Sequence, residues 1–162
     1  MTNLKQIVNL SETWAKNLKV VLQRVKQGSV EVEGKTVNEI GEGMVLLVGV
    51  KTGDTEEQAK SLADKCANLR IFEDEEGKMN LSALDVKAEI LVVSQFTLYA
   101  DTQKGRRPSF TGALEPKEAE RLYLKFVEFL KSHKLTVKTG VFGAKMLVKI
   151  FNSGPVTLIL EN

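Results

Sequence analysis

The chain has 162 residues, of which 43% are hydrophobic and 27% charged, a composition typical of one ordinary globular domain. This composition excludes a disordered chain, a collagen-like repeat and a disulfide scaffold, and no run of ~18 apolar residues predicts a membrane span. Lys plus Arg number 23 and Asp plus Glu 21, so the net charge of +2 is too small to coat nucleic acid by charge alone, although it allows a local basic patch.

Residues 1–18 carry a diluted helical pattern, in which asparagine and serine interrupt the apolar spacing. We expect a weak amphipathic helix there, an N-terminal extension of unknown role, followed by one domain that spans residues 19–162. Two short β-rich runs follow at 19–26 and 29–33, and the pattern separates them at Gly28.

A third short run at 36–40 follows a tight turn, and residues 44–50 (MVLLVGV) are continuously apolar, as expected of a strand covered on both faces. The period then changes. Apolar residues recur at helical spacing from Ala59 to Leu69, which predicts a helix with one buried stripe. Cys66 lies on this stripe, and we interpret it as a small core residue and not as a reactive thiol.

The acidic turn at 73–78 (EDEEGK) could offer carboxylates to a metal, but neighbouring carboxylates on a glycine-containing turn are more typical of solvated side chains. Residues 88–100 show the strongest strand pattern and run into a polar loop at 101–112. A second amphipathic helix begins near Pro116. His133 lies at its C-terminal end, where we expect its side chain to form a hydrogen bond with the exposed carbonyl groups of the last turn.

Two apolar strands at 144–151 and 156–160 close the chain around a turn at residues 152–155. The elements therefore follow the order strand, strand, strand, helix, strand, helix, strand, strand. This order predicts an α+β fold, with a single domain built on a curved, mostly antiparallel, barrel-like β-sheet that two helices cover.

The end of the strong strand is unusual for a purely structural protein. Residues 90–93 are apolar, yet the chain then meets Ser94, Gln95 and Thr97 in close order. Polar groups at the end of a buried strand either bond to neighbouring backbone or line a pocket and serve a ligand. The pattern alone favours neither of the two interpretations.

Gly154 and Pro155 form the second unusual segment. Glycine exposes its carbonyl without a Cβ in the way and proline has no N–H, so the pair presents bare carbonyl oxygens to whatever lies above it. A routine turn would explain the segment if it stood alone, and the sequence does not determine whether the peptide bond is cis or trans.

A basic cluster of Lys104, Arg106 and Arg107 follows the polar strand end. Such a cluster beside a candidate pocket suits contacts with phosphate, although a solvated loop is the more common explanation when the cluster is taken alone. The single cysteine excludes an internal disulfide and fits a reducing compartment, and one histidine with one cysteine cannot form a typical zinc site. The N-terminus lacks a secretory signal pattern, so the expected location is the cytoplasm.

Four motifs together resemble the D-aminoacyl-tRNA deacylases: LRIFEDEEGKMN at 69–80, SQFTLYAD at 94–101, RRPSF at 106–110 and NSGPVT at 152–157. The resemblance runs from about Lys19 to Asn162 in the order and spacing of that family. Residues 1–18 precede the usual start of the family, and Ser153 stands where its members usually carry Asp.

The resemblance implies a homodimeric hydrolase that binds the acceptor end of aminoacylated tRNA and removes D-amino acids from it, a chiral proofreading step in translation that needs no metal or organic cofactor and no membrane. It implies a pocket floor formed by Ser94, Gln95, Phe96 and Thr97. The Gly154-Pro155 pair, cis in the family, would enter the partner's pocket and exclude L side chains with its carbonyls. Because such a filter finds no side chain in glycine, we expect glycyl-tRNA to be a poor but real substrate.

Two mechanisms are open. Thr97 could act as a nucleophile, but no His or Lys lies nearby in the sequence to activate it. The resemblance to the family implies instead assistance by the 2′-OH of the terminal adenosine, with the N–H groups of Phe96 and Thr97 as oxyanion donors, and we favour this second mechanism. Other expected roles are substrate positioning for Gln95, support of the 154–155 turn for Arg24, and contact with the terminal adenine for Phe142 and Met146. The alternatives are a non-catalytic RNA-binding dimeric scaffold and a general esterase.

Overall fold

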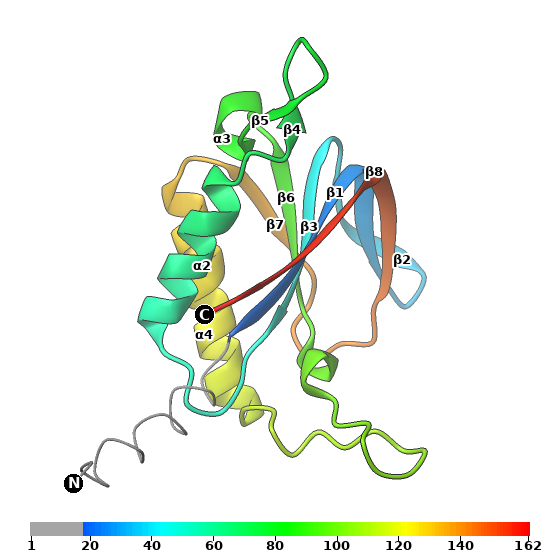
Figure 1. Ribbon diagram of the computed structural model, residues 1–162. Coiled ribbons are helices and arrows are strands. Elements are labelled where there is room, and N and C mark those ends of the chain that lie inside the picture. The colour runs from blue at the N-terminus through cyan, green and yellow to red at the C-terminus, as the bar shows by residue number, and fades with distance from the viewer. Residues whose placement is uncertain (1–17) are drawn as a thin grey trace, which may run out of the picture.

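A six-stranded sheet forms the centre of the computed structural model, which describes residues 18–162 (Figure 1). The predicted N-terminal helix lies outside the described residues, except for Leu18, which is fully buried. The elements in chain order are β1 (Lys19–Val32), β2 (Lys35–Ile40), β3 (Gly43–Gly49), α2 (Glu56–Asn68), β4 (Phe72–Glu73), β5 (Met79–Leu81), α3 (Ala83–Val86), β6 (Glu89–Ser94), the 3₁₀ helix η1 (Phe96–Tyr99), α4 (Pro116–Ser132), β7 (Thr136–Thr139) and β8 (Leu147–Glu161).

The sheet has the strand order β2-β1-β3-β6-β7, and β8 pairs with β1. The pairs of β1 with β2, β3 and β8 are antiparallel, whereas β3–β6 and β6–β7 are parallel. The predicted α+β class and the curved, barrel-like sheet are confirmed, and the sheet is mixed. The two predicted helices, α2 and α4, lie side by side against one face of the sheet, and α3 adds one short helix (Figure 1).

Strand β3 explains why residues 44–50 are apolar without interruption. Met44, Leu46 and Val48 belong to the core cluster that packs against α2 and α4. Val45 and Leu47 belong to a second core cluster on the opposite face of the sheet. Side chains alternate across a strand, so a strand with a core on each face needs apolar residues at every position.

The two long helices are fixed at defined points. Thr55 caps α2 in a capping box with Gln58. Cys66 is fully buried among the core residues, and desolvation raises the pKa of its thiol to about 12. His133 is the C-cap of α4, but its ring does not form the expected hydrogen bond with the carbonyls of the last turn. Its Nε2 lies 2.7 Å from Asp64 Oδ1, and this contact links α4 to α2.

Two strand boundaries were predicted wrongly. Strand β1 continues through Gly28, because a Cβ there would lie 2.8 Å from Val45 Cγ2 and the glycine therefore serves close packing and not a break. The strong strand pattern of 88–100 ends at Ser94, and η1 replaces its second half.

The C-terminal part also differs from the prediction. Strand β7 was missed, and β8 begins at Leu147 and runs without a break to Glu161. Residues 152–155 therefore do not form a turn between two strands. Both parts of β8 pair with β1: Asn152 lies opposite Val25 and Thr157 opposite Gln23. Residues 153–156 bulge out opposite Arg24, so the Gly154-Pro155 pair projects from the middle of a long strand.

Candidate active site

The polar end of β6 is held by its neighbour β3. The N–H of Gln95 donates to the carbonyl of Val48 at 2.8 Å, which keeps the chain beside β3 for one residue after the strand. The backbone then turns at Gln95 (φ −143°, ψ 78°) and η1 begins at Phe96. We call residues 94–97 the 94–97 segment.

The first turn of η1 leaves backbone donors available. Its hydrogen bonds run from Leu98 N to Gln95 O (3.3 Å) and from Ala100 N to Thr97 O (3.1 Å). The N–H groups of Phe96 and Thr97 have no acceptor within residues 18–162, as expected for the first N–H groups of a helix. Such donors can bind an oxygen that becomes negatively charged.

The side chain of Thr97 is exposed, and its Oγ1 accepts a short hydrogen bond from Gln95 Nε2. Among residues 18–162, no histidine, lysine or carboxylate side chain forms a hydrogen bond with this hydroxyl. An activated nucleophile needs an adjacent base, and the described residues of one chain place none beside Thr97.

A cavity of about 470 Å³, which we call the strand-end cavity, is lined by Ser94, Gln95 and Phe96 of the 94–97 segment but not by Thr97. Its wall is mostly apolar and contains two aromatic contacts: Phe96 meets Phe110 edge to face at 5.1 Å between ring centroids, and Tyr123 lies 5.8 Å from Phe142. The lining residues are Val48, Val50, Ser94, Gln95, Phe96, Phe110, Ala113, Leu114, Glu115, Pro116, Ala119, Tyr123, Phe142 and Gly143.

The structure brings Phe142 together with the 94–97 segment but separates Met146 from it. Phe142 lies in the connection between β7 and β8. Met146 does not line the strand-end cavity. It packs against the second core cluster, which contains Val45, and its sulfur accepts a hydrogen bond from the N–H of Val141 at 3.4 Å.

The bulge of β8 is held by two side chains. Arg24 is buried, and its guanidinium donates to the carbonyl of Ser153 (3.3 Å) and to that of Ile71 (2.6 Å) and pairs with Glu73 at 3.6 Å. Asn152 donates from its amide to the carbonyls of Arg24 (3.0 Å) and Val156 (2.9 Å) and thereby closes the base of the bulge.

Gly154 and Pro155 are exposed at the tip of this bulge, and the peptide bond between them is cis, which the sequence did not determine. Gly154 has φ +118°, and a Cβ on it would lie 2.7 Å from Arg24 Nη2 and 2.9 Å from Val156 Cγ2. Only glycine combines this backbone conformation with so close an approach of Arg24.

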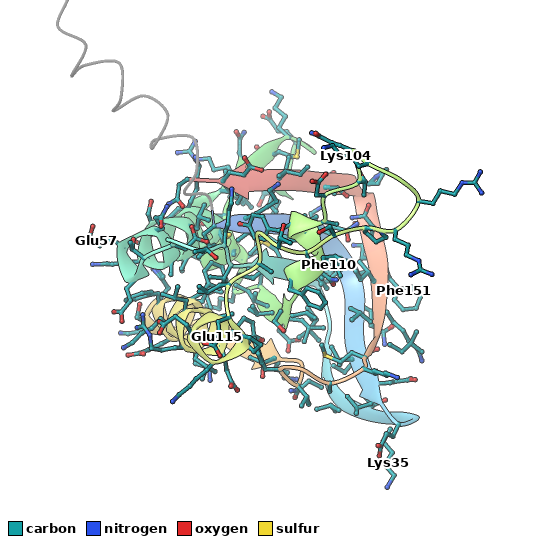
Figure 2. All side chains as sticks on the ribbon, turned by 90° about the horizontal axis from the view of Figure 1, so that it is seen from below. Lys35, Glu57, Lys104, Phe110, Glu115 and Phe151 are labelled. Carbon is teal, nitrogen blue, oxygen red and sulfur yellow. The ribbon has the colours of Figure 1, made fainter. Side chains whose placement is uncertain are left out.

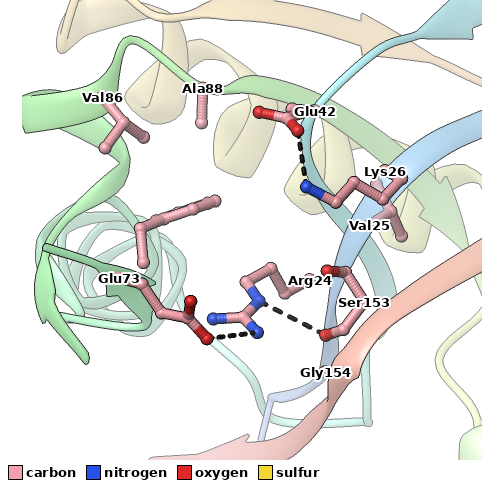
Figure 3. A pocket seen from close by; sticks show the side chains of 10 residues that line it. Arg24, Val25, Lys26, Glu42, Glu73, Val86, Ala88, Ser153 and Gly154 are labelled. Carbon is pink, nitrogen blue, oxygen red and sulfur yellow. Dashed lines mark hydrogen bonds and ion pairs between the residues drawn. The ribbon is translucent and has the colours of Figure 1, made fainter. Parts of the chain in front are cut away.

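A second cavity of about 400 Å³ borders the bulge, and we call it the clamp cavity (Figure 3). Arg24 and Ser153 lie on one side of it with Glu73 nearby, and Lys26 pairs with Glu42 at 2.7 Å on its rim. Gly154 lines this cavity and the 94–97 segment lines the other, so one chain does not bring the two predicted halves of the site into a single cavity.

Residues 21–161, which include both halves, match the family described as D-Tyr-tRNA(Tyr) deacylase. The chain belongs to this family. It is accordingly a deacylase, a hydrolase of ester bonds. A D-aminoacyl-tRNA deacylase of Aquifex aeolicus (strain VF5) is 57% identical over 145 residues, which cover 90% of this chain and 98% of the relative.

Two solved structures have the same fold. A protein titled c-Myc DNA Unwinding Element Binding Protein superposes with a TM-score of 0.83 at 43% identity and covers 89% of this chain and 98% of its own. A probable eukaryotic D-amino acid tRNA deacylase superposes with a TM-score of 0.78 at 20% identity, over 90% of this chain and 100% of its own, which supports the fold alone.

The basic cluster of this family member lies on the exposed loop between η1 and α4. Lys104, Arg106 and Arg107 do not line the strand-end cavity, but the loop returns to it at Phe110. In Figure 2 the loop runs from Lys104 past Phe110 to Glu115 at the start of α4. Asp101 and Ser109 form an antiparallel bridge that closes the loop.

Several residues of the deacylase site were not predicted. Phe110 was part of a motif but had no assigned role, although one aromatic residue in a polar loop is a signal that it packs on something. Tyr123 belongs to the core and also lines the strand-end cavity. Its hydroxyl donates to the carbonyl of Val92 at 2.9 Å, and burial raises its pKa, so it stays a donor. Asn152 and Glu73 were missed because both contact Arg24, which lies far from them in the sequence.

Within the part of the deacylase chain that the structure describes, no group of three or more His, Cys, Asp or Glu side chains is arranged to hold a metal ion. Asp74 of the acidic turn instead accepts hydrogen bonds from Glu76 N, Lys78 N and the amide of Asn80, and these bonds lower its pKa. None of the helices in residues 18–162 has the length and apolar character that a membrane crossing requires.

Proposed function

We propose that this deacylase hydrolyses the ester between a D-amino acid and the 3′ end of tRNA, releasing free D-amino acid and tRNA as a proofreading step in translation. The observation that carries the mechanism is the pair of N–H donors at Phe96 and Thr97, which have no acceptor in residues 18–162. Phe96 lines the apolar cavity, and Thr97 follows it in η1. The substrate class rests on the relative named D-aminoacyl-tRNA deacylase that aligns with 90% of the chain.

The proposed reaction uses a group of the substrate as the base. The 2′-OH of the terminal adenosine orients a water molecule, whose oxygen attacks the ester carbonyl carbon. The N–H groups of Phe96 and Thr97 bind the resulting oxyanion. The bond to the 3′-oxygen then breaks, and that oxygen leaves with the proton that the water gave up. Gln95 orients the amino or ribose group, and the adenine contacts Phe142, which lines the cavity.

Chirality is read, in this proposal, by the carbonyl oxygens of Gly154 and Pro155 and not by a side-chain pocket. One methylene changes binding in an apolar pocket by only ~1–3 kcal/mol, so side-chain contacts would sort amino acids by size. Main-chain oxygens near Cα exclude an L side chain and leave a D side chain in solvent. Glycine has nothing to exclude, and glycyl-tRNA is therefore a slow substrate.

In this proposal the carbonyls of Gly154 and Pro155 enter the active site of a second copy of the chain. Two observations support a homodimer. Gly154 borders the clamp cavity whereas the 94–97 segment borders the strand-end cavity. Within residues 18–162, β8 pairs along one edge only, and three of its large apolar side chains are exposed, with exposed fractions of 57% for Leu147, 55% for Phe151 and 67% for Ile159. Exposed apolar residues gathered on one strand are typical of an interaction surface.

The test compares hydrolysis of D-tyrosyl-tRNA, L-tyrosyl-tRNA and glycyl-tRNA, together with D-tyrosyl-tRNA whose terminal adenosine lacks the 2′-OH. We expect rapid cleavage of the D ester, slow cleavage of the glycyl ester, and no cleavage of the L ester or of the 2′-deoxy substrate. Equal rates for both enantiomers would contradict the chiral filter. Normal turnover of the 2′-deoxy substrate would contradict assistance by the substrate.

A nucleic-acid-binding protein without activity is the second candidate. The solved structure at 43% identity is titled a DNA unwinding element binding protein, and the exposed basic cluster suits phosphate contacts. Tight binding of uncharged tRNA without hydrolysis of either ester would favour this candidate, whereas turnover of simple esters would favour a general esterase. The cytoplasm stays the expected compartment, because the single cysteine fits a reducing environment.

A further inference from the structure

Strand β3 passes directly against the 3₁₀ helix η1 at Gly49. A Cβ on this residue would lie 2.9 Å from Tyr99 Cε2, 3.1 Å from Gln95 O and 3.2 Å from Leu98 Cβ. The hydroxyl of Tyr99 donates to the carbonyl of Gly49 at 3.3 Å. The backbone of β3 at this position is therefore the surface on which η1 lies.

One of these contacts cannot yield easily. A flexible side-chain tip can rotate away from a new methyl group, but Gln95 O is a backbone atom that accepts the first hydrogen bond of η1, from Leu98 N. Close packing in a protein interior transmits such a displacement to the atoms behind it. A side chain at position 49 would therefore move the start of η1 as a unit.

We propose that Gly49 is a positioning residue, whose lack of a side chain sets the position of the start of η1 and thereby of the Phe96 and Thr97 N–H groups. This inference rests on the proposed function, in which these groups bind the oxyanion. The residue before Gly49 has the complementary contact, since Val48 lines the cavity and accepts the N–H of Gln95. Two successive residues of β3 thus fix the position of the turn at Gln95. Val48 accepts a hydrogen bond from it, and Gly49 has no side chain that would push it away.

Tyr99 holds the other end of η1. Its ring is half-buried, and Lys19 Nζ lies 5.5 Å from the ring centroid while it pairs with Glu161 at 2.9 Å. Burial raises the pKa of Tyr99, so the phenol remains a hydrogen-bond donor to Gly49. Lys19 at the start of β1 and Gly49 at the end of β3 therefore both contact Tyr99, the last residue of η1. Glu161 at the end of β8 joins them through its ion pair with Lys19.

The test is Gly49→Ala, with kcat and KM measured on D-tyrosyl-tRNA. A donor displaced by a few tenths of an ångström stabilises the transition state less but leaves the binding of tRNA intact, because preorganised donors act on the developing charge. We expect kcat to fall at least tenfold while KM stays within twofold. Gly112→Ala is the matched control, because its Cβ would meet only Lys51 Cε, at 4.0 Å, and we expect it to keep wild-type kcat and KM.

A second variant covers the case in which Gly49→Ala does not fold. Tyr99→Phe removes the hydroxyl that donates to Gly49 without adding an atom, and we expect kcat to fall two- to fivefold at unchanged KM. A folded Gly49→Ala with wild-type kcat, or an effect that is confined to KM, would overturn the inference, as would wild-type kcat in Tyr99→Phe when Gly49→Ala is unfolded. If the wild-type enzyme leaves the D ester intact, the proposed function itself fails and the inference fails with it.

Discussion

The two halves of the candidate site are built in opposite ways. The 94–97 segment is held by backbone contacts with β3 and presents the exposed side chains of Phe96 and Thr97. The bulge at 154–155 is held by the side chains of Arg24 and Asn152 and presents its backbone. Replacing a side chain should therefore do little in the first region and much in the second.

Arg24→Met gives the largest effect expected from this comparison. The change removes the guanidinium and leaves the buried carbonyl of Ile71 unpaired, at a cost of ~1–3 kcal/mol, and it frees the carbonyl of Ser153. We expect a hundredfold loss of kcat/KM on D-tyrosyl-tRNA together with a lower Tm. Lys26→Met is the control, because its exposed ion pair with Glu42 contributes ~0–1 kcal/mol. Similar losses in both variants would contradict a specific role for Arg24.

Gly154→Ala should cost at least tenfold in kcat/KM. Its φ of +118° strains any L residue, and the new methyl group would push against Arg24 Nη2 at 2.7 Å. Gly34→Ala separates strain from contact, because Gly34 also has a positive φ (+76°) but a Cβ there meets nothing within 4 Å. Thermal unfolding and kinetics of both variants check this expectation. A loss of activity in Gly34→Ala as large as that in Gly154→Ala would show that strain alone is responsible.

The same contrast explains what sequence could predict. Alternation and uninterrupted apolar runs identified β1, β3, β6 and both long helices, because these patterns are local. The bulge was taken for a turn because its two flanks pair with β1, a strand more than a hundred residues away in the chain, and not with each other. Likewise, η1 was taken for strand, since Phe96, Leu98 and Tyr99 continue the apolar run and only the contact at Gly49 shows where the chain turns.

The basic cluster belongs to neither half and should affect binding alone. Replacing Lys104, Arg106 and Arg107 with alanine removes three exposed cations from the projecting loop. We expect KM for D-tyrosyl-tRNA to rise about tenfold and kcat to stay unchanged. The salt dependence of binding should weaken by roughly 0.7–0.9 in slope for each phosphate that the variant no longer neutralises. The control for charge alone replaces three lysines that are exposed on α2 and α4, Lys60, Lys65 and Lys131, with alanine and so removes the same number of charges. Equal effects in both sets would mean that net charge, and not this loop, attracts the tRNA.

Thr97→Ala should have the smallest effect, and it separates the two mechanisms. The N–H of residue 97 survives the substitution, which removes the hydroxyl that accepts from Gln95 Nε2 together with the Cγ2 methyl group. We expect kcat to fall less than fivefold, because the oxyanion donors remain in place while the amide of Gln95 loses one partner. Removal of a true nucleophile would instead abolish turnover almost completely. Single-turnover kinetics with the 2′-deoxy substrate complete the test, since a Thr97 nucleophile would form an acyl-enzyme without that hydroxyl, whereas substrate assistance requires it.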